Sequence, residues 1–111
     1  MTSIEKIATL SNQLNCQPRI KLKLDDAPEA WGYMGIYLPV SGSIELHGPR
    51  SFGEVEWLEI NPVVIEHIGR LVAPRQWSHL EQIVSLLQSE GINYSIIDSM
   101  IRIPFTGSSN I

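Results

Sequence analysis

One ten-residue stretch, Phe52–Asn61, constrains the fold of this chain more than any other. It reads Phe-Gly-Glu-Val-Glu-Trp-Leu-Glu-Ile-Asn, and a proline follows it. Valine, tryptophan and isoleucine favour strands, whereas proline cannot donate to a sheet ladder and ends them. The stretch is therefore predicted to form a β-strand at the centre of a sheet.

The predicted strand carries three carboxylates within six residues, those of Glu54, Glu56 and Glu59. Successive side chains on a strand point to opposite faces. Strict alternation places Glu54 and Glu56 on one face, and Val55, Trp57 and Glu59 on the other. Burial of an unpaired carboxylate is strongly unfavourable. The three glutamates must therefore lie on a rim, in water, or beside positive charge.

Length and composition indicate one soluble domain without covalent cross-links. A chain of 111 residues can bury one modest core. We expect a single domain over residues 1–111, with a frayed tail at 105–111. Cys16 is the only cysteine, so an internal disulfide is excluded. The sequence has neither a signal-peptide pattern nor an apolar stretch of membrane-span length, which favours a cytoplasmic location.

The net charge of −4 is unevenly distributed along the chain. Residues 1–24 hold four basic residues and one acidic residue, a balance of +3. Residues 25–66 hold eight acidic residues and one basic residue, a balance of −7, and residues 67–111 are neutral. An acidic middle third repels nucleic acid and anionic membranes and attracts basic surfaces.

Periodicity and turn residues predict the other elements. Apolar residues at helical spacing behind two capping boxes, Thr2 with Glu5 and Ser78 with Glu81, indicate two helices. Alternating or β-branched runs indicate strands, and Gly48–Ser51 has the composition of a turn. The predicted elements are helices 3–15 and 79–90, strands 19–24, 31–38 and 44–46, a short helical turn or strand within 63–72, and a hairpin of 92–97 with 100–105.

This order predicts an α+β fold, with an antiparallel or mixed sheet of about five or six strands and two helices packed on one face. The aromatic residues are mostly candidates for the core, with room for one or two as interface anchors.

Catalytic chemistry has weak support in the sequence. The carboxylates of Glu54, Glu56 and Glu59 could hold a divalent cation or act as acid and base, but their spacing matches no metal loop. His47, His67 and His79 are isolated from one another and from Cys16. We therefore expect no enzyme activity, metal or cofactor. A small metal-dependent hydrolase that uses the three glutamates is the alternative.

The second half of the chain resembles a known family. The resemblance rests on Glu54-Val-Glu-Trp-Leu-Glu-Ile, Ile68-Gly-Arg-Leu-Val-x-Pro74 and Ile92-Asn-Tyr-Ser-Ile-x-Asp98-x-x-Ile-Arg-Ile, and the first half matches only through Trp31-Gly32. These segments are similar to those of small bacterial proteins of uncharacterised function. Members of that family occur among the immunity proteins of contact-dependent growth inhibition and related polymorphic-toxin systems.

The resemblance implies an inhibitor that binds one cognate toxin domain in the cytoplasm. Such toxins are often nucleases with basic clefts, which an acidic inhibitor would complement. We therefore expect a protein partner and neither nucleic acid nor membrane, and the oligomeric state is left open. A general protein-interaction module is a further alternative. The residues expected to contact the partner are Asp25, Asp26, Glu29, Glu45, Glu54, Glu56 and Glu59 as charges, and Trp31 and Tyr33 as anchors.

Overall fold

The computed structural model describes residues 3–33, 43–47, 49–66 and 69–105, and only the main chain of residues 43–45, 49, 50 and 52. It confirms the predicted α+β class, with antiparallel pairing throughout these ranges. The elements are α1 (Ser3–Gln13), β1 (Pro18–Leu22), β2 (Ser43–Glu45), β3 (Pro49–Ser51), the 3-10 helix η1 (Phe52–Glu54), β4 (Val55–Ile60), β5 (Val63–Glu66), β6 (Arg75–Ser78), α2 (Leu80–Ser89), β7 (Ser95–Ile97) and β8 (Met100–Pro104).

Strand β4, which lies within the predicted strand 52–61, is an inner strand of a sheet, as predicted. A four-stranded sheet has the order β1-β4-β8-β7, so β4 has a neighbour on each side. The other strands form two-stranded ribbons, β2 with β3 and β5 with β6. Residues 49–51 form strand β3 rather than part of the predicted turn. Residues 31–33 are not a strand, and the rest of the predicted strand 31–38 lies outside the described residues.

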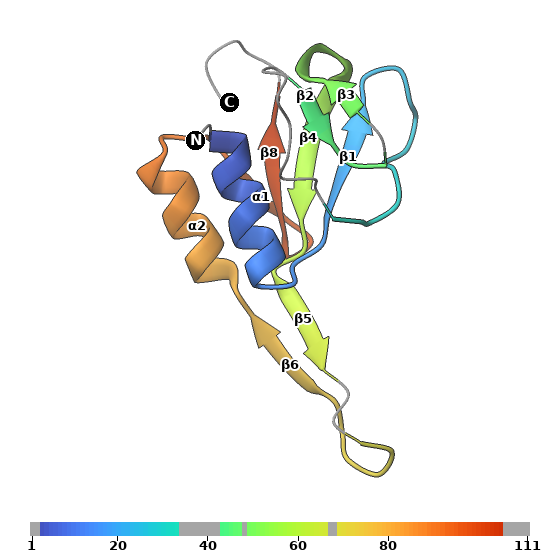
Figure 1. Ribbon diagram of the computed structural model, residues 1–111, viewed down its shortest axis with the longest axis vertical. Helices are drawn as coiled ribbons and strands as arrows, with labels where there is room; N and C mark the ends of the chain where they lie inside the picture. The colour runs from blue at the N-terminus through green and yellow to red at the C-terminus, as the bar shows by residue number, and fades with distance from the viewer. Residues whose placement is uncertain (1–2, 34–42, 48, 67–68, 106–111) are drawn as a thin grey trace.

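Both helices pack on one face of the four-stranded sheet (Figure 1). The apolar stripes of α1 and α2 are buried because they pack against every second residue of β1, β4 and β8. Phe105 also packs against this core, and residues 106–111 lie outside the described part. The fully buried residues of this core include Ile7, Cys16, Ile20, Leu46, Val55, Leu58, Ile60, Ile83, Leu87, Ile101 and Ile103.

Two local predictions at the C-terminal half are confirmed by backbone geometry. Helix α2 is followed by Gly91 at φ +68°, and the next N–H, that of Ile92, donates to the carbonyl of Leu87. Asp98 and Ser99 have φ of 51° and 66°, as a type I′ hairpin turn requires. The predicted capping box is wrong at α2, since the N-cap is His79 and makes no side-chain capping bond. Thr2 of the other box lies outside the described residues.

A β-bulge changes the predicted faces of the central strand. Lys21 lies opposite Trp57, but the next residue of β1 lies opposite Val55, so Glu56 is the extra residue. Val55 therefore joins the buried core under the helices. Glu56 lies on the same side as Trp57, where it pairs with Lys21 at 2.6 Å. The strict alternation assumed from the sequence is wrong at these two positions.

The β5–β6 ribbon extends away from the sheet and helices (Figure 1). We call residues 63–78 the arm; residues 67 and 68 within it lie outside the described part. Because of the arm, the molecule measures 48 Å along its longest axis and only 30 and 28 Å along the others. Strand β5 lies within 63–72, where a short helical turn or strand was predicted. Strand β6 was not predicted, and every one of its residues is exposed.

Candidate interaction surface

The sheet face opposite the helices carries an ion triad centred on Glu59. This carboxylate is 1% exposed, and the register places Arg19 on one side of it and Arg102 on the other. Arg19 Nε and Nη2 lie 2.9 and 2.8 Å from Glu59 Oε1. Arg102 Nε and Nη2 lie 2.8 and 2.7 Å from Oε2. Both carboxylate oxygens are thus occupied, which compensates the cost of burial.

Two tryptophans flank this triad. The Arg19 guanidinium lies 4.4 Å from the Trp31 ring centroid, and the Arg102 guanidinium lies 4.2 Å from that of Trp57. A guanidinium over an indole face is stabilised by the ring quadrupole. Trp31, a predicted anchor, thus makes an intramolecular contact with Arg19 and is half-buried.

Antiparallel pairing removes much of the charge asymmetry seen along the chain. Basic β1 lies beside acidic β4, so Arg19 neutralises Glu59 and Lys21 neutralises Glu56. The triad has a balance of +1. An acidic surface therefore does not extend over the sheet, although the middle third of the sequence has an excess of acids.

Three of the expected charge partners remain exposed at one end of the sheet. The Lys23 N–H donates to the Glu54 carbonyl, which brings the loop after β1 next to η1. Asp25, Asp26 and Glu54 are exposed and make no ion pair within the described ranges. Glu29 is half-buried, its N–H bonded to the Ile20 carbonyl. Glu45 lies in β2, and its side chain is outside the described part.

Exposed apolar side chains are concentrated at the opposite end, on the arm. Of the seven large exposed hydrophobic residues in the described ranges, four lie on the arm: Ile65, Leu71, Val72 and Trp77. Leu71 is 99% exposed and Trp77 41%. A fifth, Tyr33, lies at the root of the arm. Clustered exposed apolar and aromatic side chains are typical of protein interaction sites.

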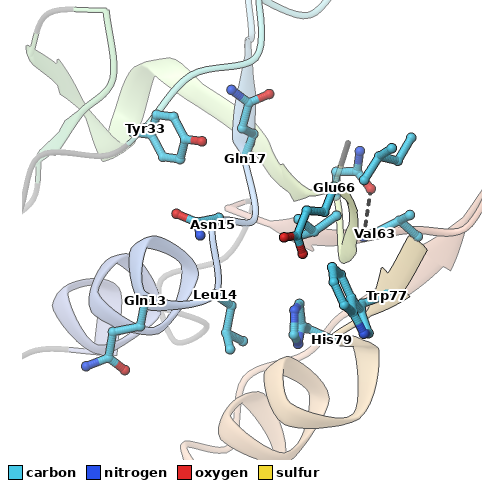
Figure 2. A pocket seen from close by; sticks show the side chains of 12 residues that line it. Gln13, Leu14, Asn15, Gln17, Tyr33, Val63, Glu66, Trp77 and His79 are labelled. Carbon is cyan, nitrogen blue, oxygen red and sulfur yellow. Dashed lines mark hydrogen bonds between the residues drawn. The ribbon is translucent and has the colours of Figure 1, made fainter. Parts of the chain in front are cut away.

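An open groove of about 770 Å³ runs along the root of the arm. Figure 2 shows one wall made by residues 13–17 together with Tyr33, and the other by β5, Trp77 and His79. Its lining is mixed, with apolar Leu14 and Val64 beside amide side chains. Among the described residues that line it, Glu66 is the only carboxylate and none is a lysine or arginine. Of the two predicted anchors, Tyr33 therefore belongs to an open surface.

The interaction surface was predicted at the acidic residues, and Trp77 was one of the aromatic residues that were mostly candidates for the core. The signal that this prediction missed is the β-branched run Val63-Val64-Ile65, followed within ten residues by Gly69 and Pro74. That combination indicates two strands joined by a long turn. In the described part of the chain, no three His, Cys, Asp or Glu side chains gather as a metal site would require.

This is a small α+β protein whose exposed apolar surface is a β-ribbon arm with a groove at its root. It belongs to a family of unknown function, DUF6678, whose model matches residues 5–105. No curated protein and no solved structure matches the chain significantly. Within the described ranges, neither α1 nor α2 is long and apolar enough to cross a membrane.

Proposed function

We propose that this protein binds and neutralises a cognate bacterial toxin domain, as the resemblance to immunity proteins implies, and that the arm and its groove form the contact. The concentration of exposed Ile65, Leu71, Val72 and Trp77 on one projecting ribbon supports this proposal. A monomer gains nothing from apolar side chains held in water, whereas their burial against a partner supplies affinity.

The acidic residues have a second role in this proposal. Asp25, Asp26 and Glu54 lie at the end of the sheet away from the arm, because β1 runs antiparallel to β4 and β4 leads into β5. They add to the net charge of −4. A negative protein is attracted to a basic partner at long range, so these carboxylates raise the association rate without touching the partner.

The hydrolase alternative has no geometric support. Both oxygens of Glu59 are bound by arginines, and Glu56 pairs with Lys21. Glu54 lies in η1, before the strand begins. Among the residues that the structure describes, the three glutamates are thus not gathered as a cation site would require.

The test is co-expression with the toxin domain encoded immediately upstream of this chain. We expect rescue of growth and a stable complex. Leu71→Ala should weaken the complex, and Leu24→Ala is its matched control, because Leu24 is 98% exposed but lies beyond β1 at the other end of the sheet. Equal effects of the two substitutions would move the contact away from the arm, and failure of rescue with a folded protein would reject the proposed function.

A further inference from the structure

Strand β5 follows β4 almost directly in the chain. One edge of β4 pairs with β1, but the corresponding edge of β5 has no neighbouring strand in the described part of the chain. Pairing on the β1 side continues as far as Asn61, whose N–H donates to the Gln17 carbonyl at 3.0 Å. Before Gln17 the chain turns into α1, with Asn15 at φ 58°. No described segment therefore pairs with β5 on this side.

The hydrogen-bond register shows which main-chain groups face that open edge. The His79 N–H donates to the Pro62 carbonyl at 2.8 Å, so the Val63–Ser78 pair is of the non-hydrogen-bonded kind. Hydrogen-bonded and non-hydrogen-bonded pairs alternate along an antiparallel ladder. The main-chain N–H and C=O groups of Val64 therefore face β6, and those of Val63 and Ile65 face the open edge.

The open edge is thus partly unsatisfied. Asn61 Oδ1 accepts the Val63 N–H at 3.0 Å, so this outward donor is already used. The Val63 carbonyl, the Ile65 N–H and the Ile65 carbonyl make no hydrogen bond within the described part of the chain. A row of such groups is a template for another strand.

The groove lies along this same edge. All four residues of β5 line it, and residues 13–17 with Tyr33 form the facing wall (Figure 2). The groove therefore occupies the place that β1 would fill if the strand began a few residues before Pro18. Its described lining residues include one carboxylate, that of Glu66, and no lysine or arginine, which favours an occupant that carries positive charge.

We propose that the toxin partner inserts an extended segment into this groove, where it pairs with the outer edge of β5 as an added strand. The segment has alternating apolar side chains, which pack against Leu14, Tyr33 and Val64, and a basic residue near Glu66. This inference rests on the proposed function and names its recognition mode. A two-stranded ribbon is only marginally stable in water, so a third strand also orders the arm.

Residue-resolved hydrogen exchange tests the proposal on the unmodified protein. In the free protein, the Ile65 amide exchanges fast and the Val64 amide slowly, because only Val64 bonds to β6. On addition of the upstream-encoded toxin domain, we expect the Ile65 amide to slow by about tenfold or more, as a newly paired amide does. An Ile65 rate unchanged in a stable complex overturns strand addition and leaves the proposed function standing.

Ile65→Pro is the matching variant. It removes an N–H that faces the groove, and proline is tolerated at such an edge position. We expect it to weaken toxin binding by about 10-fold to 100-fold, since a buried acceptor on the partner loses its donor. Ile65→Ala keeps the N–H and should cost less. Equal affinities of Ile65→Pro and Ile65→Ala overturn the proposal.

Two further outcomes are informative. Ile65 protection that rises with the concentration of this protein alone means that a second copy occupies the edge, which overturns the choice of partner. A folded protein that forms no complex with the upstream toxin domain rejects both the proposed function and this inference. The exchange measurement needs no variant, so a misfolded Ile65→Pro protein does not prevent the test.

Discussion

The four-stranded sheet and the arm are built from similar strands but are stabilised in opposite ways. In the sheet, β4 is buried on one face by two helices and on the other by paired ions and tryptophans. In the arm, β6 is exposed at every residue and the ribbon has no third strand within the described ranges. The four-stranded sheet and its two helices therefore share a buried core, whereas the arm gains most from a partner.

This contrast separates stability from binding. Substitutions of buried residues in the sheet should change the free energy of unfolding. Substitutions of the exposed arm residues Ile65, Leu71, Val72 and Trp77 should change affinity and leave the free energy of unfolding almost unaffected. Each substitution below is paired with a control at a second position that lacks the contact in question.

The largest effect is expected for Glu59→Gln. It leaves Arg19 and Arg102 close together without their shared counter-charge, and removal of one partner from a buried ion pair costs about 3–5 kcal/mol. Urea unfolding measures the change. Glu54→Gln, at an exposed carboxylate without an ion pair in the described part, should stay within about 0.5 kcal/mol. Similar losses for both would mean that the triad contributes no special stability.

The next effect compares two leucines. Leu58 is fully buried in β4, and Leu71 is 99% exposed on the arm. Leu58→Ala should lower the free energy of unfolding by about 2–5 kcal/mol because it leaves a cavity. Leu71→Ala should change it by less than about 0.5 kcal/mol. A large loss of stability for Leu71→Ala in urea unfolding would show that Leu71 packs against the sheet or the helices.

A smaller effect is expected at Gly32. A Cβ there would lie 2.8 and 2.9 Å from ring atoms of His47 and 3.1 Å from Leu46 Cδ1. Gly32→Ala should therefore destabilise the protein by about 1–3 kcal/mol through overpacking. Gly53 has no atom within 4 Å of an added Cβ, so Gly53→Ala is the matched control. Thermal unfolding of the two variants should differ clearly, and coincident curves would contradict the close approach of residues 32 and 47.

The smallest effect concerns acid stability. Hydrogen bonds from Lys6 and then Ser3 lower the pKa of Glu90 below its ordinary value of 4.5. A lowered carboxyl pKa adds stability that is fully present above the unfolded pKa and is lost as pH falls through the folded one. Lys6→Met should therefore reduce the loss of stability between pH 5 and about pH 3. Urea midpoints across that range measure the change. Lys23→Met, at an exposed lysine, is the control for one lost positive charge. An unchanged acid slope in Lys6→Met would contradict the pairing.

The parts of the fold that could be predicted depend on short-range patterns. The apolar stripe before Gly91 and the tight turn at Asp98-Ser99 involve neighbours in sequence, so α2, the last turn and β8 were predicted to within one residue at each end. The strand predicted at 92–97 is shorter, because β7 begins only at Ser95. The bulge at Glu56 depends on which strand pairs with β4, and no local pattern carries that information.

The candidate site was harder to predict for the same reason. The sequence left a rim, water or nearby positive charge as the possible surroundings of Glu56 and Glu59. In the structure, positive charge comes from Lys21, Arg19 and Arg102. Which cations meet which acids depends on sheet order, so the acidic surface was overestimated. Strand β6 was not predicted, because tryptophan is usually a core residue type but Trp77 lies on an exposed ribbon that extends away from the sheet and helices (Figure 1).

Cys16 offers a chemical reporter at the junction between these two regions. Its thiol is fully buried, lies 3.7 Å from the Pro62 carbonyl just before the arm begins, and burial raises its pKa. A protonated, inaccessible thiol reacts with alkylating reagents only when its surroundings open. The labelling rate of the native chain therefore measures how often the root of the arm comes apart, and a bound partner that orders the arm should slow that reaction without any engineered label.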